Sequence, residues 1–375
     1  MAGELDRAGI AIDHAGDHAG TCGCDACGGR AGGDAGGDLG VGGSDAFQRT
    51  GVITPTGGNP FIDALVWGNR WSGGSPVTIT YSFINDPDGD GDSFHTWTAG
   101  EQAAMRAALS TWSDVADVAF VEDAGGGGNL KFHTVASAYF QKPGILGRHY
   151  GPDGSALAGM GWFSRDGVGW TDEGRGQGGF GFVTLIHELG HAVGLAHPHN
   201  SSGVSGLFPG VASGDSSSLG TDGQNQGVYT TMSYNEGLAS DHHTPSRSVA
   251  YGYQGTPMAF DVAAVQAIYG ANTTHAGGAD TYVLTDANGA GTFYTCIWDT
   301  GGADRILYRG SRDVVIDLRP APLTGADAGG HISKAAGVVG GFTIANGVTI
   351  EAAEAGAGND RLTGNDAANG LSGGG

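Results

Sequence analysis

The most informative segment of the chain is His187-Glu188-Leu189-Gly190-His191-Ala192-Val193-Gly194-Leu195-Ala196-His197-Pro198. It continues an apolar stretch, and we predict a helix over 183–193. In a helix, His187 and His191 lie four residues apart on one face, so both imidazoles can reach one metal ion. Glu188 lies beside them, where its carboxylate can hold a metal-bound water without coordinating the ion. The segment therefore predicts a helix that carries a metal site.

The third metal ligand comes from the turn that follows this helix. Gly194 permits the positive φ that ends a helix and reverses the chain, and the turn then brings His197 to the ion. Three neutral nitrogens with an open fourth position are typical of catalytic rather than structural zinc. The alternative is a helix that happens to contain histidines, but this spacing has a chance on the order of 10⁻⁴. His199 lies just past the motif, and we interpret it as a bystander.

Composition and charge limit the classes of function. The 375 residues include 74 glycines and carry a formal net charge of −22. This excess of acid argues against nucleic acid or an anionic membrane surface as a partner. It belongs either to a solvated surface or to multivalent cation sites. No run is long and apolar enough to span a bilayer, and the N-terminus lacks the basic start and apolar stretch of a signal peptide. We therefore expect a cytosolic protein, or one exported by a route that does not read its N-terminus.

Residues 1–46 contain Gly, Ala, Asp and His with almost nothing to pack, and we interpret them as a disordered leader or propeptide. The thiols of Cys22, Cys24 and Cys27 are clustered while Cys296 stands alone, so no disulfide framework is implied. One hypothesis is that a leader thiolate occupies the fourth zinc position and keeps an enzyme latent. The alternative is a flexible tail without contact to the site.

Residues 47–270 have the pattern of an α+β domain. Alternating apolar residues predict a strand over 77–83. Thr98 and Glu101 form a capping box that opens a helix running to about Asp114. The acidic loop that follows the first strand either holds calcium or is simply solvated. We predict the remaining elements as strands over 118–121, 129–134 and 159–163 and a helix over 259–268.

Residues 271–375 carry no helix signal and are predicted to form short strands between Gly, Asp and Asn residues. Within this all-β region, 355–363 fits the nonapeptide G-G-x-G-x-D-x-U-x with one substitution, and 364–372 is a degenerate second copy. In such repeats, glycine carbonyls and the Asp face calcium, and the apolar residue begins a short buried strand. Gly-rich disorder does not explain the spacing of Leu362 and Leu371, so we predict calcium binding. A third copy begins and stops, so we expect a truncated C-terminus.

The zinc motif resembles that of the metzincins, and Leu195, His197 and Pro198 are what serralysins carry at these positions. The segments 61–68 and 79–83 are similar to the opening of a serralysin catalytic domain, and 257–269 is similar to the helix that closes it. The resemblance covers nearly all of the chain after residue 47.

A second motif downstream supports this resemblance. Thr231-Met232-Ser233-Tyr234 resembles the metzincin Met-turn, in which a Met lies beneath the zinc and a Tyr two residues later can bind the ion. A lone Met-x-Tyr is normally packing, but its distance of some thirty-five residues from His197 fits the family. Asn235 differs from the Trp that serralysins usually carry after this Tyr, which leaves the local packing open.

The resemblance implies an α+β metzincin catalytic domain followed by an all-β parallel β-roll domain of the RTX type. It implies one catalytic zinc held by His187, His191 and His197, with Tyr234 as a further ligand in the resting enzyme. The implied reaction is hydrolysis of peptide bonds in proteins by a zinc-activated water. Glu188 takes the proton of this water as general base, and Tyr234 then moves to hydrogen-bond the oxyanion.

The same resemblance implies several structural calcium ions. The segments 298–304 and 347–351 are similar to serralysin segments that bind calcium. Together with the repeat, they give the expected calcium ligands Asp299, Gly301, Gly302, Asp304, Thr349, Glu351, Gly356, Gly358 and Asp360. The resemblance also implies secretion to the extracellular medium by a one-step ABC-type route, without an N-terminal signal peptide.

The expected partners are protein or peptide substrates, and a proteinaceous inhibitor is a candidate partner. We expect no nucleic acid, no membrane insertion and a monomer. The main alternative is a calcium-dependent RTX surface or adhesion protein with a vestigial zinc site. It is disfavoured because every catalytic element is present and the repeats are few. An astacin would share Tyr234 but not the repeat domain.

Overall fold

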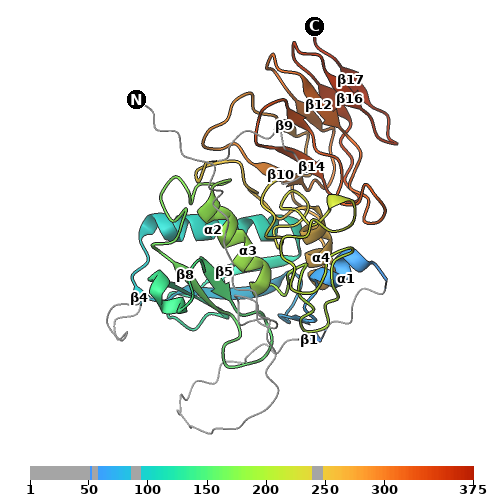
Figure 1. Cartoon of the computed structure of the whole chain (residues 1–375). Helices are drawn as coiled ribbons and strands as arrows, with labels where there is room; N and C mark the ends of the chain where they lie inside the picture. Colours follow the sequence, from blue (N-terminus) through green and yellow to red (C-terminus); the bar gives the residue numbers. More distant parts are fainter. Residues whose placement is uncertain (1–50, 53–57, 86–93, 239–247) are drawn as a thin grey trace, which may run out of the picture.

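The computed structural model describes residues 51–52, 58–85, 94–238 and 248–375. The leader cysteines and most of the acidic loop between the first strand and the first long helix lie outside these ranges. In Figure 1, helices and a mixed sheet form one part of the molecule, and the strands drawn in orange to red stack at one end of it. Among the described residues, no helix is long and apolar enough to cross a bilayer.

The main sheet has the strand order β5-β3-β6-β8-β7, with β4 paired to β6. β3 pairs in parallel with β5 and β6, and β6 pairs in parallel with β8, whereas β7 and β4 run antiparallel to their neighbours. The predicted strands are all present, with ends shifted by one residue at most. Their bounds are β3 Val77–Phe83, β4 Phe94–His95, β5 Val118–Glu122, β6 Leu130–Val135, β7 Gly147–His149 and β8 Met160–Ser164.

Helix α2, Ala99–Val115, begins with the predicted capping box. Thr98 Oγ1 accepts the backbone N–H of Glu101, and Glu101 Oε2 accepts that of Thr98 at 2.8 Å. The metal-motif helix α3, Phe180–Ala192, starts three residues before the predicted start because Gly179 forms its N-cap. The helix α4, Ala259–Tyr269, ends one residue later than predicted.

Helix α1, Pro60–Leu65, was not predicted from the sequence. Asn59 caps it by accepting the backbone N–H groups of Phe61 and Ile62, and a proline occupies the first turn. The remaining small elements before residue 259 are β1 Gly51–Val52, β2 Asn69–Arg70, and the 3₁₀ turns η2 Ser137–Phe140 and η3 Thr221–Gly223.

The region after α4 contains only strands among its regular elements, as predicted. β10 pairs with β14, β12 with β16, and β11 with both β9 and β15, all in parallel. β17 adds to β15 at the end of its sheet, so Leu371 is 47% exposed and the expected burial of this residue is wrong. The bounds are β9 Thr281–Val283, β10 Tyr294–Ile297, β11 Arg305–Leu307, β12 Val314–Asp317, β13 Lys334–Ala335, β14 Gly341–Ile344, β15 Ala352–Glu354, β16 Arg361–Thr363 and β17 Gly370–Ser372.

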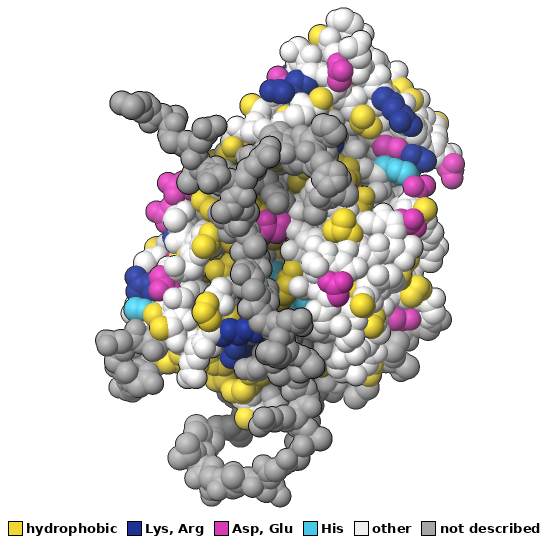
Figure 2. Space-filling view, in the orientation of Figure 1, with side chains coloured by type: hydrophobic (Ala, Val, Ile, Leu, Met, Phe, Trp, Pro, Cys, Tyr) yellow, Lys and Arg dark blue, Asp and Glu magenta, His cyan; other side chains and the backbone are white. Residues whose placement is uncertain are grey.

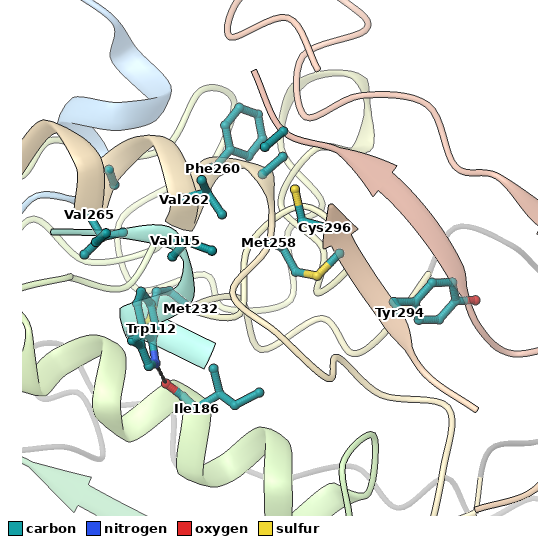
Figure 3. Close-up of a cluster of buried hydrophobic side chains, with 14 of the residues drawn as sticks. Trp112, Val115, Ile186, Met232, Met258, Phe260, Val262, Val265, Tyr294 and Cys296 are labelled. Atoms are coloured by element: carbon teal, nitrogen blue, oxygen red, sulfur yellow. Dashed lines mark hydrogen bonds between the residues drawn. The ribbon is translucent and has the colours of Figure 1, made fainter. Parts of the chain in front are cut away.

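The helical part and the strand region share one hydrophobic core. In Figure 3, the indole of Trp112 in α2 reaches the carbonyl of Ile186 in α3, with an N···O distance of 3.3 Å. On the other side of this core, Cys296 of β10 lies beside Met258, which precedes α4. The strand region is therefore packed directly onto the helical part, at the start of α4.

Acidic side chains are scattered over the visible surface. On the face shown in Figure 2, several Asp and Glu side chains lie beside Lys, Arg or His side chains. This distribution fits a solvated surface for most of the excess acid. The exceptions are carboxylates that converge in the strand region, described below.

Candidate metal centre

The structure brings the three predicted histidines together. Nε2 of His187 and Nε2 of His191 each lie 3.0 Å from Nε2 of His197. Nδ1 of His187 donates to the carbonyl of Thr231 at 2.8 Å, and Nδ1 of His191 donates to that of Leu195 at 2.9 Å. Since a carbonyl only accepts, these contacts place the hydrogen on Nδ1 and leave a lone pair on Nε2 of both neutral rings.

This donor set fits zinc. Two lone pairs directed at one nitrogen repel each other unless a cation lies between them. With Zn–N bonds of about 2.0–2.1 Å in a tetrahedron, ligand nitrogens are separated by about 3.3 Å. The separations of 3.0 Å are within a few tenths of an ångström of this value. Backbone acceptors on the second ring nitrogen are the usual partners of metal-bound histidine.

The turn that delivers His197 is braced by a segment far away in the sequence. Gly194 has a φ of 103°, as predicted for the helix end, and a Cβ there would lie 2.6 Å from the carbonyl oxygen of Asn69. The N–H of Trp67 donates to the carbonyl of Gly194 at 2.9 Å. The N–H of Ala196 donates to the carbonyl of Leu65 at 2.8 Å. The chain that follows α1 therefore holds the reversal in place.

Two side chains satisfy the last carbonyls of α3. The indole of Trp71 donates to the carbonyl of Ala192 at 2.8 Å, and the hydroxyl of Tyr269 donates to that of Val193 at 3.0 Å. All of these groups are buried. Burial raises the pKa of the Tyr269 hydroxyl, which keeps it a hydrogen-bond donor. Sequence reasoning missed both contacts, because nothing in a lone Trp or Tyr shows which carbonyl it will reach.

Glu188 is buried and lies on α3 at the wall of a pocket that also contains His187 and His197. The pocket is lined by 144–147, by residues of the Met motif and by 253–254. A Cβ on Gly147 would lie 2.7 Å from Cγ of Glu188, so only glycine allows this strand to approach the carboxylate so closely. The geometry puts a carboxylate and a metal-binding histidine cluster into one cavity.

The predicted Met-turn lies against this cluster, and we call residues 230–234 the Met232 turn. Met232 is fully buried beneath α3, where a Cβ on Gly190 would lie 2.5 Å from its sulfur. The ring of Tyr234 lies 4.8 Å from that of His197 between centroids. The ring of His199 stacks on that of His197 at 5.0 Å and lies 4.7 Å from that of Tyr234, between centroids.

A buried carboxylate in α4 anchors the Met232 turn. Asp261 accepts the hydroxyl of Thr230 at 2.6 Å, the N–H of Thr231 at 2.6 Å and the N–H of Met258 at 2.8 Å. Burial raises the pKa of Asp261 to about 6, although these donors oppose the shift. The carbonyl of Thr231 accepts from Nδ1 of His187, and the N–H of Thr231 donates to Asp261. Asp261 therefore holds the ring of His187 through one intervening residue. The sequence showed this Asp only as part of a helix, and its partner lies thirty residues away.

In the strand region, three carboxylates converge. Oxygens of Asp280, Asp299 and Asp304 lie within 4.8 Å of one another. The N–H of Gly301 donates to Asp299, and the N–H of Asp304 donates to Glu351, both at 2.8 Å. Burial and the charges of Asp299, Glu351 and Asp280 raise the pKa of Asp304. Asp280 was not among the predicted ligands, although it follows a Gly-Gly-Ala stretch as Asp304 does.

These carboxylates fit a hard cation such as calcium. Oδ2 of Asp304 is buried and has no hydrogen-bond donor within the described part of the chain. Gly302 packs so closely that a Cβ there would lie 1.7 Å from the carbonyl of Gly278. Among the other predicted calcium ligands, Thr349 is exposed.

The nonapeptide residues lie against the loop that precedes β12. Oδ1 of Asp360 accepts the N–H of Val314 at 2.9 Å, while its buried Oδ2 has no donor among the residues described. A Cβ on Gly356 would lie 2.1 Å from the carbonyl of Gly310, and one on Gly358 would lie 2.2 Å from that of Arg312. Glycine is required here for close backbone approach.

Comparison with known families agrees with this geometry. Residues 70–222 match the family model Matrixin, and residues 259–370 match the family model Peptidase M10 serralysin C terminal. The first match contains all three histidines, and the second contains the converging carboxylates. The fold and the histidine cluster therefore define a metzincin.

Individual relatives specify the branch. The chain is 30% identical over 317 residues to metallopeptidase AprA of Pseudomonas marginalis, covering 80% of this chain and 62% of the relative. It is 30% identical over 335 residues to serralysin of Proteus mirabilis, covering 81% and 63%. It is 32% identical over 317 residues to serralysin C of Dickeya chrysanthemi, covering 78% and 60%. The chain belongs to the serralysin-type metzincins, and it spans about three fifths of the length of these relatives.

Proposed function

We propose that this protein is a zinc-dependent endopeptidase that hydrolyses peptide bonds of proteins. The observation that carries the proposal is the convergence of three histidine Nε2 atoms, two of them 3.0 Å from the third, beside the buried Glu188. The relatives named serralysin and metallopeptidase support the same activity.

In the proposed mechanism, His187, His191 and His197 would hold one zinc ion, and Tyr234 would be a further ligand at rest. When bound, zinc would supply Lewis-acid chemistry for the scissile carbonyl and the attacking water. Glu188 takes the proton of the attacking water and passes it to the leaving amine. Tyr234 donates its hydroxyl hydrogen to the oxyanion, and Met232 supports the histidines from below.

We further propose that the strand region is a calcium-binding β-roll that starts near residue 271, after a catalytic domain over 47–270. Its parallel strand pairs and the buried, unpaired oxygens of Asp304 and Asp360 support this assignment. Several calcium ions would be held by the residues predicted from the sequence, with Asp280 added at the Asp299–Asp304 cluster.

We also propose that the protein acts outside the cell as a monomer on protein or peptide substrates. Residues 1–46 would be a leader, and a proteinaceous inhibitor is a candidate regulator. The surface or adhesion protein with a vestigial zinc site is the alternative, and the intact cluster beside Glu188 argues against it.

The test is digestion of a denatured proteome, followed by mass spectrometry of the released peptides. New cleavage sites should appear with zinc-loaded protein and vanish after chelation with phenanthroline, then return when zinc is restored. Protein with one bound zinc that releases no peptide would favour the vestigial site.

A further inference from the structure

One wall of the pocket beside the histidine cluster is tied to the strand region. Tyr253 and Gln254 line the pocket and belong to the segment 252–255. Gly252 donates to the carbonyl of Thr292 at 2.9 Å, and the N–H of Tyr294 donates to the carbonyl of Tyr253 at 3.0 Å. The N–H of Gly255 donates to the carbonyl of Tyr294 at 2.9 Å. The pocket wall therefore forms an isolated parallel bridge, Gln254 to Tyr294, at the start of β10.

Phe293 packs against this wall. A Cβ on Gly255 would lie 2.3 Å from the ring of Phe293. A Cβ on Gly178 would lie 2.4 Å from the Cβ of Phe293. The half-buried Phe293 is thus held between the pocket-wall segment and the residue just before the N-cap of α3. Since Gly178 has a φ of 86°, a larger residue would be strained there as well as crowded.

The same contacts reach the rings that face the pocket. The N–H of Tyr253 donates to the carbonyl of Gly178 at 3.1 Å. Its ring lies 5.0 Å from that of Phe180 between centroids, and both line the pocket with Val183. These aromatic and aliphatic groups give the pocket an apolar wall, which suits an apolar side chain of the substrate.

We infer that Phe293 of the strand region is a positioning residue for the substrate pocket, holding the Tyr253–Phe180 wall that receives an apolar substrate side chain. The inference rests on the proposed peptidase function. Phe293 lies beside Gly178, just before α3, whereas Glu188 lies further along that helix. Loss of Phe293 should therefore weaken substrate binding and leave the chemical step largely intact.

The test compares Phe293→Ala with Phe342→Ala in the full, zinc-loaded and calcium-loaded chain. Phe342 is a matched control because it is also half-buried, lies on β14 beside β10, and packs near Tyr282 rather than at the pocket. A peptide pair is used that differs only in Leu or Gly next to the scissile bond. Phe293→Leu serves as a milder variant that keeps the fold if Ala does not.

We expect Phe293→Ala to raise KM for the Leu peptide about tenfold, with kcat changed less than twofold and the Gly peptide little affected. Phe342→Ala should lower Tm without changing the Leu-to-Gly ratio of kcat/KM. The preference for Leu over Gly should also appear in the Kd values of two hydroxamate inhibitors built on the same peptides. Their binding can be measured without turnover. Equal ratios in wild type and Phe293→Ala would overturn the inference. Wild-type protein that binds zinc and cleaves neither peptide would instead refute the proposed function.

Discussion

Asp261 gives the sharpest test of how the metal centre is held. Replacing it with Ala leaves three buried donors without an acceptor: the N–H groups of Thr231 and Met258 and the hydroxyl of Thr230. Each unsatisfied donor costs about 1–3 kcal/mol, or roughly 6 kcal/mol for the set. The substitution also removes a buried charge. Because burial raises the pKa of Asp261 to about 6, ionisation at pH 7 costs about 3 kcal/mol, and this cost disappears.

Together, the two effects should lower the free energy of unfolding of Asp261→Ala by about 3 kcal/mol. Asp261→Asn should lose only about 1 kcal/mol, because its amide oxygen can still accept the two backbone N–H groups. Both variants should also weaken zinc binding, since Thr231 holds the ring of His187 at 2.8 Å. Partners behind metal-binding histidines typically change affinity by about 10–100-fold. We expect the upper part of that range for Ala and the lower part for Asn.

The assay measures the free energy of unfolding of the apo protein by denaturant titration and the zinc Kd by competition with a chromophoric chelator. Leu130→Ala is the control, because Leu130 is fully buried on β6 and its loss costs about 2–5 kcal/mol in the sheet. If Asp261→Ala and Leu130→Ala lose similar stability and bind zinc equally well, Asp261 has no role in holding the metal centre.

Further predictions concern the chemistry, the acid response and the strand region. Glu188→Ala should keep zinc, measured by mass spectrometry under native conditions, while kcat/KM falls by several orders of magnitude; near-normal turnover would remove Glu188 as the base. Tyr234→Phe should lower kcat and change KM little, and a pure KM effect would assign the hydroxyl to substrate binding. Burial lowers the pKa of His149 to about 4, so its contribution to stability is complete above about pH 6.5 and falls by about 3 kcal/mol towards pH 4. His149→Phe should therefore flatten the pH dependence of the unfolding free energy, and an unchanged slope would contradict this. Removing calcium should lower the Tm of the strand region, because Asp299 and Asp304 then repel each other; identical hydrogen exchange of β10 and β11 with and without calcium would argue against bound calcium.

The elements that the sequence predicted well are those with a strong local signal. The capping box of Thr98 and Glu101 fixed the start of α2, and alternation fixed β3 to the residue. The histidine spacing placed three side chains that the structure brings to one point. Helix α1 was missed because six residues with a proline at the start show too little periodicity. Leu371 was misjudged because burial of a repeat residue depends on a covering strand, which β17 lacks among the described elements.

The remaining parts of the metal centre could not be predicted because their contacts run through the backbone. The carbonyl of Leu65 and the N–H of Trp67 hydrogen-bond to the turn before His197, and almost any residue type could supply these groups. Only Gly194 left a trace in the sequence, since a Cβ there would meet the carbonyl of Asn69. The motif therefore names the ligands, whereas the chain after α1 determines where the third one lies. It follows that a substitution which displaces this brace, far from the motif in sequence, should weaken the metal centre chiefly through His197.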